Sequence, residues 1–278
     1  MKIALIDSGI GLLAAAAAIR RLRTDADLIL SSDPDGMPWG PRSTPDLRQR
    51  VLAAALAAAA HDPDALVIAC NTATVHAMPT VKAMLEPAIP VIGTVPAIKT
   101  AAASGGPVAI WATPATTGSS YQDALIRAYA AGVHVTEIAC PGLADAVQCA
   151  DPSAIGEAVA DASRRTPAGV TDVVLGCTHY ELVAGQIQSA LSRPSLITPV
   201  LRGSADPVAA QVMRRLTGRP AETAKGGAAR PALTTTLIAE ASASNARSFT
   251  GAPRLPRTSR TSARPLAAAF DADGLARV

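Results

Sequence analysis

Two stretches of the sequence follow one plan, and together they constrain the fold more than any other feature. Residues 66–74 (LVIACNTAT) and 173–180 (VVLGCTHY) each contain a short apolar run, a small residue, a cysteine and then an amide or hydroxyl residue. The apolar runs and the helical sequence after them predict buried strands of parallel sheets. In open α/β sheets ligands bind at the carboxyl ends of the strands, which is where Cys70 and Cys177 are expected.

The same spacing separates a second pair of landmarks. Cys177 follows Cys70 by 107 residues, and Thr113 follows Asp7 by 106 residues at the end of another predicted strand. We therefore expect two similar α/β halves whose polar turns face each other across a cleft. A single free cysteine is most often a small buried hydrophobe. The matched pair instead indicates two opposed proton carriers.

Strand and helix patterns alternate along the chain, which predicts parallel sheets covered by helices. The second half is expected to begin near Pro96. The predicted strands are residues 2–6, 27–31, the run before Cys70, 89–94, 108–112, 133–138, the run before Cys177, 195–198 and the β-prone segment 231–238. The predicted helices include residues 44–60, 74–86, 97–103, 181–191, 204–217 and 239–249.

The composition argues against several classes of protein. The chain of 278 residues is 49% hydrophobic and 3% aromatic, so we expect a core of Ala, Val, Leu and Ile. Four cysteines without a C-x-x-C pair and four histidines argue against a disulfide scaffold or a metal site. The chain begins directly with a predicted strand and has no apolar stretch long enough to span a bilayer, which predicts a cytoplasmic protein. Positive charge is concentrated after residue 218, so the preceding body does not resemble a nucleic-acid-binding surface.

Several polar residues near predicted strand ends are candidates for ligand binding. The turn at residues 7–11 (DSGIG) suits a carboxylate or phosphate, although Asp7 could serve only as a helix N-cap. Trp39 lies in a loop rich in Pro and Gly and is either a hydrophobic plug or a wall of a ligand site. The hydroxyl-rich residues 113–119 could hold a carboxylate or cap a helix. We interpret His179, two positions after the second cysteine, as functional rather than structural.

Taken together, these motifs resemble those of glutamate racemases within the aspartate/glutamate racemase superfamily. The matching segments occur in the family's order: residues 7–11, PWG at 38–40 (Pro-Tyr-Gly in the family), ACNTA at 69–73, residues 113–121, ACP at 139–141 and LGCTHY at 175–180. The resemblance extends from residue 2 to about residue 250. The two cysteine motifs together are highly specific, whereas Asp-Ser-Gly alone is not.

The resemblance implies an α/β fold with two pseudo-symmetric domains, each a mostly parallel sheet flanked by helices, and an active site in the interdomain cleft. It assigns residues 1–95 and 204–250 to the first domain and residues 96–203 to the second, which leaves 251–278 as a basic tail that we expect to be disordered. It also implies a glutamate racemase, an isomerase that needs no cofactor and supplies D-glutamate for peptidoglycan. One thiolate would take the α-proton, and the other thiol would return a proton to the opposite face.

Roles for individual residues follow from the resemblance. Asp7 would support Cys70, which acts on the D-enantiomer, and His179 would support Cys177, which acts on the L-enantiomer. The expected substrate site consists of Asp7, Ser8, Trp39, Gly40, Asn71, Thr72, Thr116, Thr178 and His179. The chemistry is consistent with such neighbours, because a free thiol has a pKa of about 8.5 and needs activation before it can remove a proton from carbon.

The sequence also departs from the family pattern. Leu12 replaces a glycine, Trp39 replaces a tyrosine, Gln148 replaces an acid near the histidine, and residues 32–34 read Ser-Asp-Pro in place of Ala-Asp-Thr. These departures leave two alternatives open: a racemase for aspartate or another small amino acid, and a catalytically idle amino-acid-binding or regulatory protein. A thiol redox protein is disfavoured because no resolving cysteine is near in sequence. A homodimer is one option that the sequence leaves open.

Overall fold

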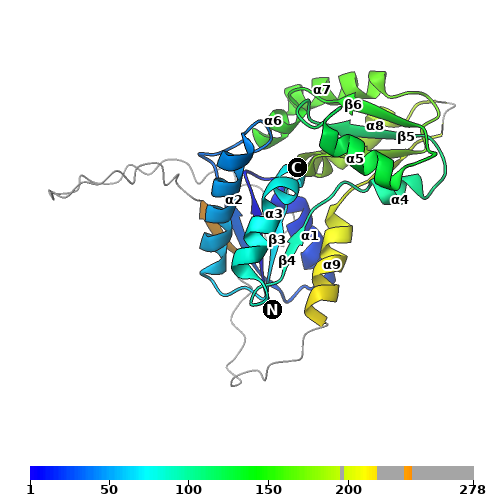
Figure 1. Ribbon diagram of the computed structural model, residues 1–278. Helices are drawn as coiled ribbons and strands as arrows, with labels where there is room; N and C mark the ends of the chain where they lie inside the picture. Colours follow the sequence, from blue (N-terminus) through cyan, green and yellow to red (C-terminus); the bar gives the residue numbers. More distant parts are fainter. Residues whose placement is uncertain (195–196, 218–234, 240–278) are drawn as a thin grey trace.

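Two parallel sheets, each with helices on both faces, form the described part of the protein (Figure 1). The computed structural model describes residues 1–194, 197–217 and 235–239. The order in the first sheet is β4 (Val91–Gly93), β3 (Ala65–Ile68), β1 (Lys2–Asp7), β2 (Asp27–Ser32) and β9 (Thr235–Ala239). The order in the second is β6 (Val135–Ala139), β5 (Val108–Ala112), β7 (Asp172–Leu175) and β8 (Val200–Arg202). Every pairing between these strands is parallel.

The helices connect the strands in the alternating order that the sequence predicts. Those of the first half are α1 (Leu12–Leu22), α2 (Thr44–Ala59) and α3 (Asn71–Leu85). Those that follow are α4 (Ile98–Ala102), α5 (Ser120–Tyr129), α6 (Leu143–Gln148), α7 (Pro152–Arg165), the 3₁₀ helix η1 (Thr178–Val183), α8 (Ala184–Leu191) and α9 (Ala205–Thr217).

The two sheets repeat one arrangement. In the first, β1 lies between β2 and β3, and β4 follows β3; in the second, β5 lies between β6 and β7, and β8 follows β7. The strands that precede the two cysteines, β3 and β7, therefore occupy equivalent places. The predicted α/β fold with two pseudo-symmetric halves is confirmed, and the repeat of 106–107 residues is its sequence signature.

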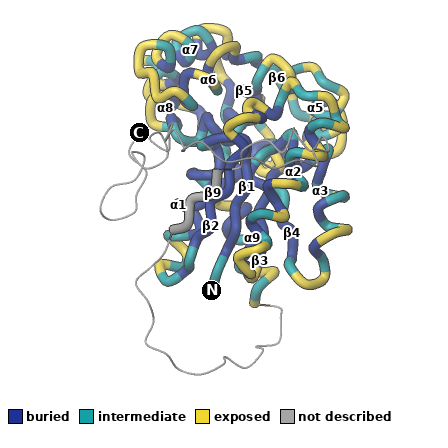
Figure 2. The backbone as a smooth tube through the Cα atoms, turned by 90° about the vertical axis from the view of Figure 1, so that its left-hand side faces the viewer, coloured by how far each residue is buried: buried dark blue, intermediate teal, exposed yellow. Residues whose placement is uncertain are grey.

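Each sheet is buried on both faces because alternate strand residues point to opposite sides. Ile3 and Leu5 pack with residues of α1 and α9, whereas Ala4 and Ile6 pack with residues of α2 and α3. The second sheet likewise contacts α6, α7 and α8 on one face and α4 on the other. Figure 2 shows the result: buried strands inside and exposed residues along the outer sides of the helices. Ile10 packs against a core cluster of each half, so the halves are in direct contact.

Three sequence predictions need correction. The strand predicted at 195–198 is wrong in position: residues 197–198 are outside any strand, residues 195–196 lie outside the described part, and β8 begins at Val200. The helix predicted from residue 74 begins at Asn71, because Cys70 already takes the extended conformation of an N-cap residue. The helix predicted at 181–191 is divided, since its first turn belongs to η1 and α8 begins at Ala184.

The C-terminal predictions are tested only in part. α9 contacts α1, and β9 pairs with β2, so both lie with the first sheet. The β-prone segment 231–238 overlaps β9, and its first four residues lie outside the described part. The helix at 239–249, apart from residue 239, and the disordered tail at 251–278 also lie outside it. The domain boundaries stay a prediction.

Among residues 1–194, 197–217 and 235–239, no helix combines the length and apolar character needed to cross a bilayer.

The second half contains a buried polar contact whose contribution to stability can be measured. Trp111 of β5 is fully buried, and its indole Nε1 donates a hydrogen bond to Thr166 Oγ1 at 2.9 Å. Trp111→Phe and Thr166→Val each remove one partner. We expect each to lower the free energy of unfolding, and the double variant to lose about 1 kcal/mol less than the sum. Urea denaturation of the four proteins measures this coupling, and strictly additive losses would contradict the contact.

Candidate active site

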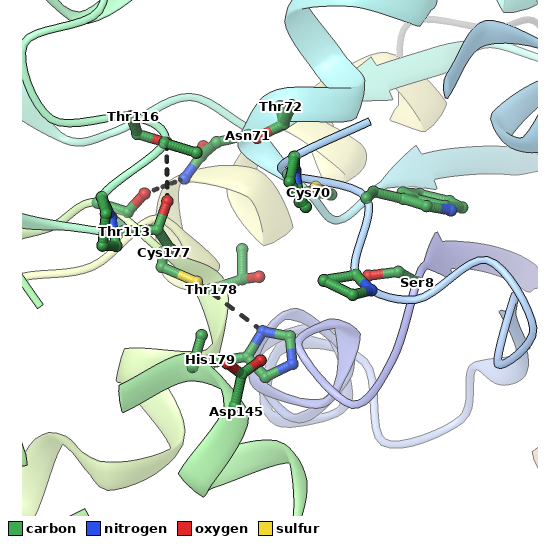
Figure 3. A pocket seen from close by; sticks show the side chains of 18 of the residues that line it. Ser8, Cys70, Asn71, Thr72, Thr113, Thr116, Asp145, Cys177, Thr178 and His179 are labelled. Carbon is green, nitrogen blue, oxygen red and sulfur yellow. Dashed lines mark hydrogen bonds between the residues drawn. The ribbon is translucent and has the colours of Figure 1, made fainter. Parts of the chain in front are cut away.

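A pocket of about 290 Å³ lies between the carboxyl ends of the two sheets, where the sequence placed the ligand site (Figure 3). All of the residues predicted for catalysis or substrate binding line it: Asp7, Ser8, Trp39, Gly40, Cys70, Asn71, Thr72, Thr116, Cys177, Thr178 and His179. The structure therefore brings the predicted set together from both halves. Their individual roles stay predictions.

The two cysteines occupy equivalent backbone positions. Cys70 is the N-cap of α3 with φ −140° and ψ 128°, and Cys177 is the N-cap of η1 with φ −131° and ψ 136°. Each sulfur therefore faces the first backbone N–H groups of a helix, which come from Thr72 and Ala73 for Cys70. His179 and Tyr180 supply these groups for Cys177. Such N–H groups stabilise a thiolate.

Burial outweighs these N–H groups in the resting site. Desolvation is the largest influence on both thiols, and it raises the pKa of Cys177 to about 12 and that of Cys70 further. The buried Asp7 carboxylate raises both values again through charge repulsion. Both thiols are therefore protonated at neutral pH, and a base forms only when a neighbouring group accepts the thiol proton.

Asp7, the last residue of β1, is a buried carboxyl group that lines the pocket and influences the pKa of both thiols. Its Oδ1 accepts hydrogen bonds from the backbone N–H of Ser8 at 2.6 Å and from Ser8 Oγ at 3.3 Å. Burial nevertheless raises the pKa of Asp7 to about 7, so this carboxyl group exchanges a proton near neutral pH. The N-cap interpretation of Asp7 is wrong, because α1 begins at Leu12 with Gly11 as its N-cap.

His179 lies beside the second cysteine. Its Nδ1 is 3.8 Å from Cys177 Sγ, and its Nε2 is 2.9 Å from Oε1 of Gln148 (Figure 3 shows the first contact). Burial lowers the pKa of His179 to about 4, so the imidazole is neutral at neutral pH. A neutral imidazole with one nitrogen facing a thiol is a proton acceptor within reach.

The residue after each cysteine reaches across the cleft to the opposite half. Asn71 donates from Nδ2 to the backbone carbonyl of Gly176 at 2.9 Å, directly before the second cysteine. Thr178 donates from Oγ1 to Asp7 Oδ2 at 3.5 Å. A Cβ added to Gly11 would lie 2.3 Å from Asp7 Oδ2 and 2.4 Å from Thr178 Oγ1, so the turn needs glycine there. Each cysteine turn is thus held by a hydrogen bond that the residue after its cysteine donates to the opposite half.

The loop after β2 places Trp39 as a wall of the pocket. The Trp39 side chain is buried, and its Nε1 donates to Asp33 Oδ2 at 3.0 Å. Asp33 is in turn paired with Arg50 of α2 at 3.3 Å and accepts the Gly36 backbone N–H at 2.9 Å. Polar contacts within this loop and an ion pair with α2 therefore hold it in place.

The hydroxyl-rich segment after β5 caps a helix and lines the pocket, and its binding of a carboxylate stays a prediction. Ser119 is the N-cap of α5 and accepts a hydrogen bond from the backbone N–H of Gln122 at 3.2 Å. Thr113 and Thr116 line the pocket, and their hydroxyl oxygens lie 3.1 Å apart.

Three polar pocket residues were absent from the predicted site. Thr113 carried a signal, since it stands at the repeat distance from Asp7. Cys140, which the sequence offers only as part of the ACP motif, is buried and also lines the pocket. Asp145 of α6 gave no signal in its spacing. In the described residues, no group of three or more His, Cys, Asp or Glu side chains could hold a metal ion.

Comparison with known proteins identifies relatives of this chain. The family model for Asp/Glu/Hydantoin racemase matches residues 12–205. The glutamate racemase of Roseiflexus sp. (strain RS-1) is 34% identical over 229 residues, which are 81% of this chain and 84% of that protein. The glutamate racemase of Mycobacterium leprae (strain TN) is 34% identical over 228 residues, which are 79% of this chain and 80% of that protein.

Solved structures share the fold. The Escherichia coli glutamate racemase in complex with L-glutamate and the activator UDP-MurNAc-Ala superposes with a TM-score of 0.74 at 24% identity, covering 86% of this chain and 98% of that one. The glutamate racemase from Thermus thermophilus in complex with β-chloro-D-alanine gives 0.62 at 26% identity and covers 85% of each chain. The family match over residues 12–205 and the two relatives at 34% identity show that the chain belongs to the Asp/Glu/Hydantoin racemase family, and the prediction of an isomerase of the racemase class is confirmed.

Proposed function

We propose that this protein is a glutamate racemase that interconverts the two enantiomers by proton transfer between two thiols, without a cofactor. The observation that carries the proposal is the pair of equivalent cysteines on the walls of one pocket, which Figure 3 shows with His179 beside Cys177. The Asp7 carboxyl group lines the same pocket and influences the pKa of both thiols. The names of relatives at 34% identity support glutamate as the substrate. By the same relationship we propose a cytoplasmic enzyme that supplies D-glutamate for peptidoglycan.

The proposed reaction is balanced within the pocket. A thiolate on one wall takes the α-proton and becomes a thiol, while the thiol on the other wall gives its proton to the opposite face and becomes a thiolate. Cys177 acts as the base toward L-glutamate, and Cys70 acts as the base toward D-glutamate. Asp7 and His179 accept the thiol protons that form each base, and they return protons after turnover.

Substrate binding supplies part of the activation. The α-ammonium group brings a positive charge into a pocket whose thiols are neutral, and that charge favours the thiolate. Asn71 offers an acceptor for this group, because its buried Oδ1 has no hydrogen-bond partner within the described residues. The hydroxyl groups of Ser8, Thr72 and Thr116 on the pocket wall can donate to the substrate carboxylates.

The first prediction from the proposed function concerns the two thiols. Cys70→Ser and Cys177→Ser should each lower kcat/KM for racemisation at least about a thousandfold, because a serine hydroxyl is a far weaker acid than a thiol. The losses should be equal in both directions, since two enantiomers have an equilibrium constant of one. Cys149→Ser is the matched control, because Cys149 is exposed and lies outside the residues that line the pocket. Polarimetry with glutamate and aspartate gives the rates.

Full activity of Cys70→Ser or of Cys177→Ser would contradict the two-thiol mechanism. Equal rates with aspartate would assign the broader substrate class. Binding of glutamate by a folded protein without racemisation would favour the idle amino-acid-binding alternative.

The second prediction uses the raised pKa of Asp7. Between its ordinary pKa of 3.8 and its folded value of about 7, the folded protein keeps a proton that the unfolded chain loses. Folding therefore becomes less favourable as pH rises through this window. Asp7→Asn removes the effect, so the variant should gain stability relative to the natural protein, up to a few kcal/mol, at about 1.4 kcal/mol per pH unit. The difference should vanish near pH 4.

Urea denaturation at about pH 4 and about pH 8 measures this difference. His179 titrates with the opposite sign, since its pKa is lowered to about 4, but it is present in both proteins and cancels in the comparison. A stability difference that stays constant with pH would contradict the raised pKa.

The third prediction concerns Asn71. Asn71→Leu has a similar size but removes both the bond to Gly176 and the free acceptor, so kcat/KM should fall about 10- to 100-fold. Asn71→Asp keeps an acceptor for the substrate and loses the donor to the Gly176 carbonyl. It therefore separates the contribution of the acceptor from that of the hydrogen bond to Gly176. If Asn71→Leu leaves KM unchanged, Asn71 does not contact the substrate.

A further inference from the structure

Gln148 joins three elements of the site through a single oxygen atom. It is the last residue of α6, and its Oε1 lies 2.9 Å from the backbone nitrogen of Ile10 and 2.9 Å from Nε2 of His179. Ile10 belongs to the turn after β1, whereas Gln148 and His179 belong to the second half. The contact therefore crosses the cleft.

The orientation of this amide follows from Ile10. A backbone N–H group only donates, so the Gln148 atom that faces it must be the carbonyl oxygen. A carbonyl oxygen can accept two hydrogen bonds but has no hydrogen to donate, so the second group that it contacts must also be a donor. Nε2 of His179 therefore carries the proton.

The other ring nitrogen is then determined as well. A neutral imidazole has one N–H group, so Nδ1 of His179 carries a lone pair. That lone pair faces Cys177 Sγ at 3.8 Å, where it can accept the thiol proton. The alternative tautomer would direct an N–H group at the sulfur and leave no acceptor for the thiol proton.

The turn after β1 is shaped for this contact. A Cβ placed on Gly9 would lie 2.1 Å from Gln148 Oε1 and 2.8 Å from its Cδ. Any side chain at this position would displace the amide, so only glycine allows Gln148 to reach the Ile10 N–H.

We propose that Gln148 is a positioning residue that, held by Ile10 across the cleft, fixes His179 as the Nε2–H tautomer and so aims the Nδ1 lone pair at the Cys177 thiol. The contact joins the two halves. If the halves separate, Gln148 loses the Ile10 N–H that orients its amide, and the tautomer of His179 is no longer fixed. When the thiol proton moves to Nδ1, Nε2–H still donates to Gln148, so one geometry serves both protonation states. The Nε2–H donor follows from the two contacts of Gln148, and the Nδ1 lone pair follows from the neutral state of the buried imidazole. Only the catalytic consequence rests on the proposed function.

Nitrogen NMR of the chain of 278 residues with ¹⁵N-labelled histidine tests the proposal in the absence of substrate. The signals of His179 are identified by their loss in His179→Asn, and the other histidines, His61, His76 and His134, serve as internal references. At neutral pH we expect a protonated-type shift at Nε2 and an unprotonated-type shift at Nδ1. A His179 protonated at Nδ1 would overturn the proposal.

Variants separate positioning from mere packing. Gln148→Met has a similar size and no acceptor, so the two His179 shifts should move toward the average of two exchanging tautomers. Gln148→Glu keeps the acceptor and should keep Nε2 protonated. Gly9→Ala keeps the glutamine side chain at position 148, but its added Cβ displaces the Gln148 amide. The variant should therefore behave like Gln148→Met.

The variants can support the proposal or overturn it. A folded Gln148→Met protein with unchanged His179 shifts would overturn the proposal, and so would a Gln148→Glu protein that resembles Gln148→Met. In an active racemase, Gln148→Met should lower kcat/KM at least tenfold while Gln148→Glu retains more activity. The Nε2–H signature in a protein that does not racemise glutamate would refute the proposed function and leave the tautomer assignment standing.

Discussion

Two hydrogen bonds that cross the cleft hold the cysteine turns against each other, and the site depends on them. Asn71, directly after one cysteine, binds the carbonyl directly before the other. Thr178, directly after the second cysteine, binds the Asp7 carboxyl group of the first half. Each half therefore completes the other's turn. Because the cysteines are helix N-caps at equivalent strand ends, these contacts fix two thiols on the walls of one pocket.

The same burial that shapes the pocket works against its chemistry. Desolvation raises the pKa of both thiols, and helix N-terminal N–H groups offset only part of that rise. The two proposed acceptors of the thiol protons, Asp7 and His179, respond to burial in different ways. Asp7 has its pKa raised to about 7, and His179 has its pKa lowered to about 4, so one acceptor exchanges a proton near neutral pH and the other stays neutral. The proposed mechanism thus combines two different acid–base pairs in a symmetric frame.

Much of this arrangement could be predicted from the sequence, because it depends on local patterns. The apolar runs before Cys70 and Cys177 gave β3 and β7, and their repeat distance indicated two similar sheets. Contacts between distant segments carried no such pattern. The bond between Ile10 and Gln148 links residues 138 positions apart, so Gln148 read only as the loss of an acid. Likewise, β8 was misplaced because its short stretch at Val200 has no distinctive periodicity.

The partition of solvent deuterium during one enantiomer's conversion tests the two-thiol account most directly. The protein is incubated with L-glutamate in D₂O, and the α-proton of each enantiomer is followed at low conversion. Two opposed thiols predict deuterium in the D-glutamate that forms and little in the remaining L-glutamate, because the proton is removed on one face and a solvent-derived deuteron is added on the other. D-glutamate that retains the original α-proton, or rapid exchange into L-glutamate ahead of racemisation, would contradict the account and indicate a single base.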